Sequence, residues 1–394
     1  MLTFFAIDAA LALNFLTNDR LVLRAECALA ATHQTRAKMQ TSDRAVFRVD
    51  YTHMGRRSSG IERVTSELFN SQALSPLDVR PYGASSSRPG VIAAQMLGLP
   101  LCAIRRPSDV FIFPGFPPSP YFSLARDRSV LYVHDLFLLS RREDLNRAGK
   151  YYMAPMFSIA IKNFRYFLTN SEETARNLRI RCNPAATIVL YRPAQKNVFG
   201  LEVGDRTQRI HDPPKLRVLS IGTIEPRKNF LGAAAICDSL SAQLKREVEL
   251  HIIGRFGWGD AVDKLSKHPN VVLHGYRSDA EARSIIEASD IFLCTSHQEG
   301  LGLPLLEVQY CGMPVVAPDE VVFRESLGAS GIFIDPNSPK HAADHIVGKI
   351  AVPSWRLQYV DAAATNIARW NAIAESDRGT VISFLSKLAS NLRR

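Results

Sequence analysis

Cysteine is scarce in this sequence, with six among 394 residues. No two of them show the two-residue gap that zinc sites and dithiol redox motifs need. This usage predicts reduced, structural thiols without a disulfide framework, and it is typical of the reducing cytosol. The six are Cys27, Cys102, Cys182, Cys237, Cys294 and Cys311.

Long hydrophobic runs are missing as well. The longest apolar stretch beyond the start, residues 91–104, is interrupted by Gln95 and Pro100 and is too short to cross a bilayer. Residues 1–16 are apolar, but they contain Asp8 and lack the basic leader and cleavage site of a signal peptide. The sequence therefore predicts no transmembrane helix. With 46% apolar and 22% charged residues, a chain of this length is expected to form two globular domains.

Two interpretations of residues 1–44 stay open. In one, this N-terminal extension forms an accessory amphipathic helix. In the other, the start codon is misassigned and Met39 lies nearer the true beginning, because the first convincing strand, residues 45–51, follows it closely.

Acidic residues are in the minority, and the imbalance lies in the first half. Residues 1–200 contain 26 Lys and Arg against 15 Asp and Glu, a net charge of +11, whereas residues 201–394 contain 22 against 23. Arginine doublets stand at residues 56–57, 105–106 and 141–142. Such a charge attracts polyanions, anionic lipid surfaces or phosphorylated substrates, unless the arginines are merely solvated.

The first half alternates extended apolar runs with helical patterns, which predicts one α/β domain over residues 45–200. Its further strands are expected at residues 109–113, 130–135 and 164–169, and helices at 62–69 and 171–179. The chain is polar and rich in proline from Arg192 to Pro214, and its last part, residues 201–214, is expected to be the linker.

The second half contains short, continuous apolar runs with glycine at several of their ends. Continuous runs indicate strands buried on both faces, so residues 215–352 are expected to form a parallel, doubly wound sheet. The ligand site of such a sheet lies beyond the carboxyl ends of its strands. Residues 353–394 are expected to be helices that cross back to the first domain. The runs are 218–222, 250–254, 271–275, 291–295, 315–317 and 332–335.

Two adjacent cations, Arg227 and Lys228, follow the first of these strands. They lie in a loop before an alanine-rich helix, a position suited to binding a diphosphate. The alternative is an exposed turn without a ligand.

Residues 296–307 follow a later strand, turn through two glycines and open a helix with Pro304 in its first turn. Glycines let backbone amides approach an anion, and the helix dipole adds partial positive charge. Glu299 in the loop and Glu307 in the first helical turn are expected to face one cavity, where carboxylates suit the vicinal hydroxyls of a sugar and a ribose. In the alternative interpretation, Glu307 only complements the helix dipole.

Together these residues resemble the retaining glycosyltransferases of family 4. The resemblance covers about residues 45–375 and implies the GT-B fold, an α/β architecture of two Rossmann-like, doubly wound parallel-sheet domains facing a cleft. Residues 222–229 resemble a branch of the family that builds bacterial surface polysaccharides. The other matching positions are the paired glutamates Glu299 and Glu307, Gly275-Tyr276, Asp290, residues 312–315 and Asp335-Pro336.

The resemblance implies transfer of a sugar from a nucleoside diphosphate sugar, with retained configuration, to a glycan or a polyprenyl-diphosphate-linked acceptor. Glu307 would bind the ribose, Glu299 the transferred sugar and Lys228 the diphosphate. Thr223 stands where many members place an arginine, so Arg227 would supply the second cation. No cofactor is implied, and neither the family nor the spacing of residues implies a metal site.

In the first half, residues 58–63 resemble the glycine loop of the family, with close backbone approach at Gly60 only. His134 ends a buried strand and resembles a histidine near the transferred sugar, although a buried histidine with satisfied hydrogen bonds is the alternative. The implied catalytic residues are Glu299, His134, Arg227 and Lys228. The implied donor-binding residues are Gly60, Thr223, Arg227, Lys228, Tyr276, Glu299, Gly300, Leu301, Gly302, Leu303 and Glu307.

Trp258 and its neighbours are similar to mannosyl- and deoxysugar-transferring members, so mannose is a candidate among the hexoses. A lipid-linked acceptor implies a cytoplasmic protein attached peripherally to an anionic membrane at its inner face. Two other classes stay open: an epimerase or a phosphorylase of the same fold, and a basic nucleic-acid-binding protein. Nucleic acid is not expected as a partner, because the aromatic residues do not interleave with the basic doublets and no helix-turn-helix or zinc pattern is present.

Overall fold

The computed structural model describes residues 45–54, 60–83, 87–141, 145, 147–204 and 215–393. The N-terminal extension, the doublet at 56–57, Arg142 and most of the expected linker lie outside the described residues. Residues 47–394 form one compact unit. None of the described helices is both long and apolar enough to cross a membrane. The five cysteines that the structure describes are free.

The first half builds a six-stranded sheet with the strand order β2-β1-β3-β4-β5-β6. From β1 through β3, β4 and β5 to β6, each neighbouring pair is parallel. The order reverses between β1 and β3, which is the switch point of this sheet. The strands are β1 (Val46–Asp50), β2 (Asp78–Tyr82), β3 (Val110–Phe113), β4 (Ser129–Val133), β5 (Tyr166–Thr169) and β6 (Thr187–Leu190).

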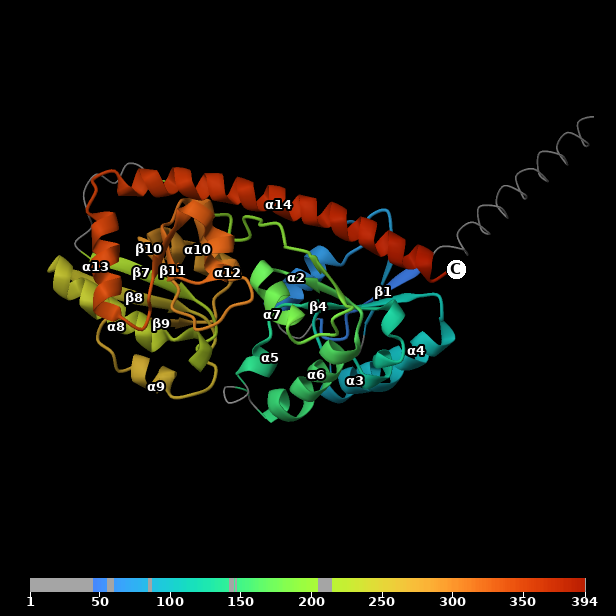
Figure 1. The fold of residues 1–394 in the computed structure, drawn as a ribbon. Helices are drawn as coiled ribbons and strands as arrows, with labels where there is room; N and C mark the ends of the chain where they lie inside the picture. Colours follow the sequence, from blue (N-terminus) through green and yellow to red (C-terminus); the bar gives the residue numbers. More distant parts are fainter. Residues whose placement is uncertain are drawn as a thin grey trace, which may run out of the picture. The chain divides into compact units, whose positions relative to one another are not determined.

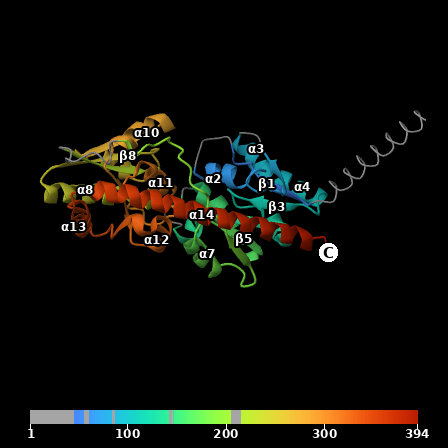
Figure 2. The same ribbon diagram turned by 90° about the horizontal axis from the view of Figure 1, so that it is seen from above.

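Helices cover both faces of this first sheet, as Figures 1 and 2 show. Alternate residues of β3 illustrate the two faces: Phe111 and Phe113 pack against α4 and α6, and Val110 and Ile112 against α2 and the end of α14. The helices of this half are α2 (Gly60–Leu68), α3 (Arg88–Ala93), the π-helix η1 (Ala94–Gly98), α4 (Leu99–Arg105), α5 (Phe137–Ser140), α6 (Ala154–Asn163) and α7 (Glu172–Arg179). Short turns lie at η2 (Pro120–Ser123), η3 (Arg126–Arg128) and η5 (Gly149–Met153).

The second half builds another six-stranded sheet, with the order β12-β11-β10-β7-β8-β9 and parallel neighbours throughout. Its switch point lies between β7 and β10, because the chain moves from β7 to β8 and β9 on one side and returns to the other. The strands are β7 (Lys215–Ile221), β8 (Glu247–Ile253), β9 (Val271–Gly275), β10 (Ile291–Leu293), β11 (Val315–Pro318) and β12 (Gly331–Ile334).

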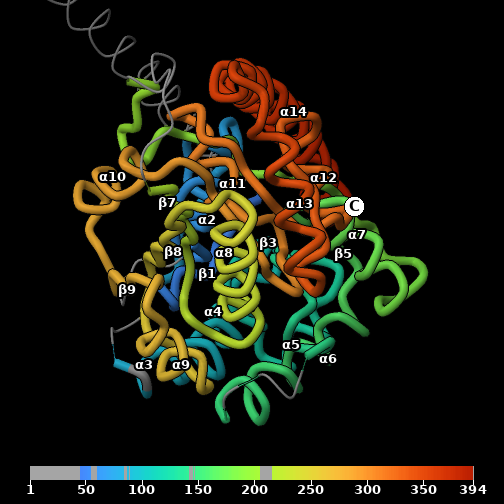
Figure 3. The backbone as a smooth tube through the Cα atoms, turned by 90° about the vertical axis from the view of Figure 1, so that its left-hand side faces the viewer, coloured from blue at the N-terminus to red at the C-terminus, as the bar shows by residue number. Residues whose placement is uncertain are grey.

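One face of the second sheet packs against α8 and α13, which lie side by side in Figure 3, and the other against α10, α11 and α12. Side-chain caps fix where some helices begin: Asn229 accepts from Gly232 at α8, and Ser278 and Glu281 form a capping box at α10. The helices are α8 (Phe230–Leu244), α9 (Ala261–Leu265), α10 (Asp279–Ala288), α11 (Leu303–Glu307), α12 (Val321–Leu327) and α13 (Pro339–Ile350), with turns η7 (Pro226–Lys228), η8 (Val308–Cys311) and η9 (Gly328–Ser330).

A single 37-residue helix, α14 (Trp355–Asn391), replaces the several C-terminal helices expected from the sequence. Trp355 at its start packs in the core of the second sheet, and Val381 and Leu385 pack in a core of the first. Between them, Trp370 packs with Leu301 and donates its indole N–H to the carbonyl oxygen of Pro193. The helix therefore bridges the two sheets (Figure 2).

The two doubly wound parallel sheets confirm the predicted fold class. Each predicted strand is present, although the strand expected at 164–169 begins only at Tyr166. β2 and β6, the two edge strands of the first sheet, were not expected from the sequence, and their residues are only partly buried.

Candidate functional site

The site is built where β7 and β10 end, at the switch point of the second sheet. These two strands are parallel neighbours, so the loops that follow them emerge at the same edge. Hydrogen bonds tie the two loops together: the Thr295 hydroxyl donates to the carbonyl oxygen of Asn229 over 2.8 Å, and the His297 amide donates to that of Arg227 over 2.8 Å. The Arg227-Lys228 turn and the Glu299 loop, distant in sequence, thus form one unit.

The Glu299 carboxylate lies between the two predicted cations. Lys228 Nζ donates to Oε1 over 2.5 Å, and Arg227 Nη1 donates to Oε2 over 3.0 Å. Burial alone would raise the pKa of Glu299, but the charges of Lys228 and Arg227 outweigh burial and hold its pKa at about 2. Glu299 is therefore an anion at neutral pH and cannot serve there as a proton donor.

Arg227 is held more firmly than a free phosphate-binding arginine would be. Four of the five N–H donors of a guanidinium are occupied: two bond Glu225, one bonds Glu299 and one bonds the carbonyl oxygen of Gln298. Burial opposes its charge, but Glu299, Glu225 and Asp135 outweigh burial and raise its pKa above the ordinary value. Arg227 therefore fixes the position of Glu299, whereas the Lys228 ammonium makes one hydrogen bond among the described residues, to Glu299.

Glu307 lies apart from this cluster and has another partner. It is the last residue of α11, not a residue of the first helical turn as predicted, and α11 is only five residues long. A helix this short has only a small dipole, so the predicted contribution of the dipole to anion binding is small. Glu307, at the end of α11, does not complement the partial positive charge at the start of the helix. Its carboxylate instead accepts a hydrogen bond from Arg63 Nη2 of α2. Burial raises the pKa of Glu307, and Arg63 opposes this rise.

The end of β4 approaches the Glu299 loop closely. A Cβ added to Gly300 would overlap the carbonyl oxygen of His134, so only glycine fits there. The Ser140 hydroxyl donates to Gln298 Oε1 over 3.0 Å, and the guanidinium of Arg227 lies 5.4 Å from the ring centre of Phe137. Residues of both sheets therefore line the same site.

Comparison with known proteins agrees with this geometry. Residues 205–351, which contain the whole β7–β10 switch point, match the family described as glycosyl transferases group 1. The protein is a glycosyltransferase, and its second sheet resembles the group 1 family. A nucleotide-sugar donor and a retaining mechanism fit this family.

Two curated relatives are similar to this glycosyltransferase at low identity. The chain is 27% identical over 256 residues to an O-antigen chain mannosyltransferase B of Escherichia coli, covering 62% of this chain and 67% of the relative. It is 23% identical over 308 residues to a D-inositol 3-phosphate glycosyltransferase of Segniliparus rotundus, covering 74% and 62%. The matches thus span about two thirds of the relatives' lengths.

A solved structure supports the GT-B fold. Sucrose-phosphate synthase from Thermosynechococcus elongatus superposes with a TM-score of 0.67 over 87% of this chain and 100% of its own, at 14% identity. At this identity the likeness concerns the fold alone.

The His134 side chain of the glycosyltransferase is tied to the neighbouring strand. Its Nε2 lies 2.7 Å from the carbonyl oxygen of Pro114, so this nitrogen donates and Nδ1 remains as an acceptor. Burial lowers the pKa of His134, although the bond to Pro114 opposes this. The imidazole is therefore neutral at physiological pH.

His53, which the sequence analysis did not single out, lies at the switch point of the first sheet. Its Nε2 is 3.2 Å from the hydroxyl oxygen of Thr65, and its ring fills the space beside Gly115. Burial, together with His134, lowers its pKa to about 4. Arg63 was also not identified as a functional residue from the sequence. His53 and Arg63 are both polar residues shortly after the first strand, and this feature is too common to identify a functional site.

The remaining predicted donor-binding residues lie in different surroundings. Thr223 lies against Gly257 in a loop that pairs with the segment after β8, and Gly302 has a φ of +77°. Leu301 packs with Trp370 in an apolar cluster, and Leu303 is partly buried beside it, so their side chains serve packing. Gly60 begins α2 with open space where a Cβ would be.

Tyr276 is the predicted residue that the structure places farthest along the sheet from the cluster. It follows β9, two strands from β7, where the residue is 61% exposed and its ring centre lies 4.8 Å from the guanidinium of Arg255. A small cavity beside the cluster is lined by Ser220, Lys228, Ser296, Glu299 and Gly302 among others. Neither Glu307 nor Tyr276 lines this cavity.

Among the described residues, no group of three or more His, Cys, Asp or Glu side chains is arranged to hold a metal ion.

Proposed function

We propose that this glycosyltransferase moves a hexose from a nucleoside diphosphate sugar, with retained configuration, to a glycan or a polyprenyl-diphosphate-linked acceptor during synthesis of a surface polysaccharide. The observation that carries the proposal is the Glu299–Lys228–Arg227 cluster at a topological switch point, facing the end of β4. The similarity to an O-antigen chain mannosyltransferase favours mannose as the hexose and an O-antigen-like glycan as the product.

Lys228 is the group that contacts the donor diphosphate in this proposal. The leaving group of the reaction is a nucleoside diphosphate, so transfer is accelerated by cations that stabilise the charge developing on its oxygens. The Lys228 ammonium carries three N–H donors, and its bond to Glu299 engages one of them. Arg227 does not contact the diphosphate in this proposal, and it acts indirectly by holding Glu299 and its loop in position. Backbone amides near Gly60 and Gly302 add further donors.

Glu299 and Glu307 bind hydroxyl groups at opposite ends of the donor. Glu299, an anion with a pKa of about 2, accepts from the hydroxyls of the transferred sugar. Glu307 accepts from the ribose hydroxyls, which replace Arg63. Neutral His134 offers Nδ1 as an acceptor near the sugar, and Tyr276 lies at the base end of the donor. Because cations of the chain itself neutralise the diphosphate, we propose that the reaction proceeds without a metal ion.

In this proposal, the acceptor binds to the first half of the chain. Its net charge of +11 suits a phosphorylated, lipid-linked acceptor at an anionic membrane surface. Attachment to the cytoplasmic face would then be peripheral and weakened by salt.

A donor screen tests the proposed function. Purified protein is first heated with UDP, GDP, ADP or dTDP, since a nucleotide at 100 times its dissociation constant adds roughly 2.7 kcal/mol of stability. The matching nucleotide sugars are then incubated with and without a lipid-linked acceptor, in the presence and absence of EDTA. We expect product only with acceptor, and equally with EDTA. Conversion of the donor sugar without acceptor would identify an epimerase instead.

Two variants complete this test. Glu299→Gln is expected to reduce kcat much more than nucleotide affinity, because its proposed partner is the transferred sugar. Glu247→Gln, in an exposed ion pair with Lys215, is the matched control and should leave both unchanged. Equal, negligible effects of both substitutions would contradict the proposed role of Glu299.

A further inference from the structure

An uncovered apolar stripe runs along the helical segment from Arg88 to Arg105. This segment comprises α3, η1 and α4 without a break in helical backbone conformation. Four large apolar side chains on it are exposed: Ile92 by 46%, Leu97 by 64%, Leu101 by 49% and Ile104 by 60%. A run of exposed aliphatic side chains of this kind marks an interaction surface in a soluble domain.

The π-helical turn brings these four residues into line. Their spacings are five, four and three residues, and the spacing of five falls on η1, where the Leu99 amide donates to the carbonyl oxygen of Ala94. A π-turn places residues about five apart on one face, as an α-turn does for residues three or four apart. Pro100, which lacks an amide hydrogen, follows this wide turn directly.

The opposite face of the same segment is anchored in the protein. Leu99 and Ala103 are buried in the core with Phe122. The buried Gln95 donates to the hydroxyl of Thr52 over 2.9 Å and accepts from Tyr152. The helix therefore cannot rotate to bury its stripe without breaking these contacts.

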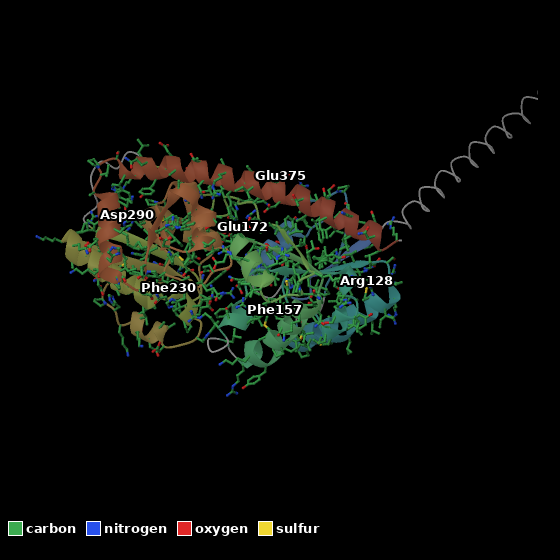
Figure 4. All side chains as sticks on the ribbon, in the orientation of Figure 1. Arg128, Phe157, Glu172, Phe230, Asp290 and Glu375 are labelled. Atoms are coloured by element: carbon green, nitrogen blue, oxygen red, sulfur yellow. The ribbon has the colours of Figure 1, made fainter. Side chains whose placement is uncertain are left out.

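The surroundings of the stripe are basic. No Asp or Glu occurs between Arg88 and Ser108, and Arg105 and Arg106 at its end are exposed. The next acidic residue along the chain, Asp109, is buried and bound by Arg48 over 2.6 Å. Arg128, labelled in Figure 4, donates to the carbonyl oxygens of Ala103 and Arg106, so it brings η3 beside the end of α4.

The neighbouring η2–η3 segment has the same character. Leu124 is 86% exposed, and the adjoining Arg126 is exposed too. The one acidic side chain in this short stretch, Asp127, pairs with Arg165 over 2.6 Å. Apolar side chains bordered by arginines therefore continue from α4 onto this second segment.

We propose that this stripe, Ile92, Leu97, Leu101 and Ile104 with its arginine border, lies in the headgroup region of an anionic phospholipid bilayer. The aliphatic groups would enter the acyl boundary, and the arginines would bind lipid phosphates. A second copy of the chain fits the stripe less well, because a symmetric contact would bring two basic borders together. The proposal rests on the proposed function, since it names the surface that brings the enzyme to a lipid-linked acceptor.

Vesicle sedimentation of the full chain tests this surface. Wild type should sediment with equimolar phosphatidylcholine–phosphatidylglycerol vesicles, and high salt or pure phosphatidylcholine should weaken binding. We expect the triple substitution Leu97→Ser, Leu101→Ser, Ile104→Ser to weaken binding at least tenfold. Arg105→Ser with Arg106→Ser should weaken it at low salt and remove most of its salt dependence. The control, Val352→Ser with Leu357→Ser, replaces two exposed aliphatic residues beyond the second sheet and should bind as wild type does.

The thermal response to nucleotide, recorded for each variant, keeps this proposal separate from the proposed function. Variants that keep that response are folded, so a loss of vesicle binding belongs to the stripe. Vesicle binding by the triple variant equal to that of wild type would overturn the proposal. So would a wild type that ignores anionic vesicles and instead forms a dimer that the triple substitution dissociates. Failure of the proposed function would show as intact vesicle binding without any transfer product.

Discussion

Arg63 of α2 donates a hydrogen bond to Glu307 Oε1 of α11, across a sequence separation of 244 residues. This ion pair joins α2, which packs on the first sheet, to α11, which packs on the second. The Glu307 side chain is only 5% exposed, so its charge depends on the arginine. A ligand that uses Glu307 must therefore replace Arg63 or share the carboxylate with it.

Removing either partner should affect nucleoside binding. Glu307→Ala is expected to weaken the affinity for a nucleoside and for its diphosphate alike, roughly 10- to 150-fold, because one charge-assisted hydrogen bond contributes about 1.5–3 kcal/mol. In Arg63→Ala the pKa of Glu307 should rise further, since Arg63 opposes the effect of burial. Nucleoside affinity of this variant should then fall more steeply than that of wild type as pH is lowered. Isothermal titration at several pH values measures both effects, and parallel pH profiles would contradict the second.

Lys228 and Arg227 should differ although they are adjacent. Lys228→Ala is expected to reduce affinity for a nucleoside diphosphate much more than for the nucleoside, because its proposed partner is phosphate. Arg227→Ala should instead lower the free energy of unfolding by about 3–5 kcal/mol, because it leaves the Glu225 carboxylate buried and unpaired. Urea unfolding and titration calorimetry on both variants make the comparison. If the nucleoside affinity of Lys228→Ala falls just as far, the loop has only a structural role.

Gly300 should not tolerate a side chain. In Gly300→Ala the new methyl group meets the carbonyl oxygen of His134 and pushes the Glu299 loop away from β4. We expect a large loss of kcat with a smaller loss of nucleotide affinity, since the Lys228 and Glu307 side chains themselves are unchanged. Gly348→Ala in α13 is the matched control, because its new methyl group has nothing within 4 Å. It should keep full activity and gain about 0.5–1 kcal/mol of stability. Equal activity of the two variants would show that close approach of β4 is not needed.

Asp50 should make stability depend on pH. Burial raises its pKa to about 6 from 3.8, against hydrogen bonds from Thr52 that lower it. Its contribution to the free energy of unfolding is therefore complete below pH 3.8 and is lost as pH rises through about 6. Asp50→Asn keeps an acceptor for the Thr52 amide and carries no charge.

The Asn variant should thus equal wild type near pH 4 and exceed it at pH 7 by up to about 3 kcal/mol, from 1.36 kcal/mol per pKa unit. Urea unfolding at the two pH values measures this difference. A difference that does not change between them would mean that Asp50 titrates normally.

The sequence by itself determined the strands, the fold class and most of the loops that carry the site. Continuous apolar runs such as 218–222 and 291–295 mark buried parallel strands, and the residues just after them are Thr223, Arg227, Lys228 and Glu299. This inference succeeds because burial on both faces of a strand depends on local composition. The edge strands β2 and β6 escaped it, since edge positions are only partly buried.

The tertiary structure decided which of these residues meet. That Glu299 lies on Lys228 follows from β10 pairing with β7, a strand order set by packing of helices on both faces of the sheet and not by any local pattern. The same applies to Arg63 on Glu307, and to Gly300 against His134, which join residues of different sheets. The apolar stripe from Ile92 to Ile104 also escaped detection, because the π-turn breaks the 3.6-residue period by which an exposed helix face is recognised. The local periodicity of apolar residues determines the helices and strands. Only the packing of these elements brings charged residues and glycines that are distant in sequence together at the site.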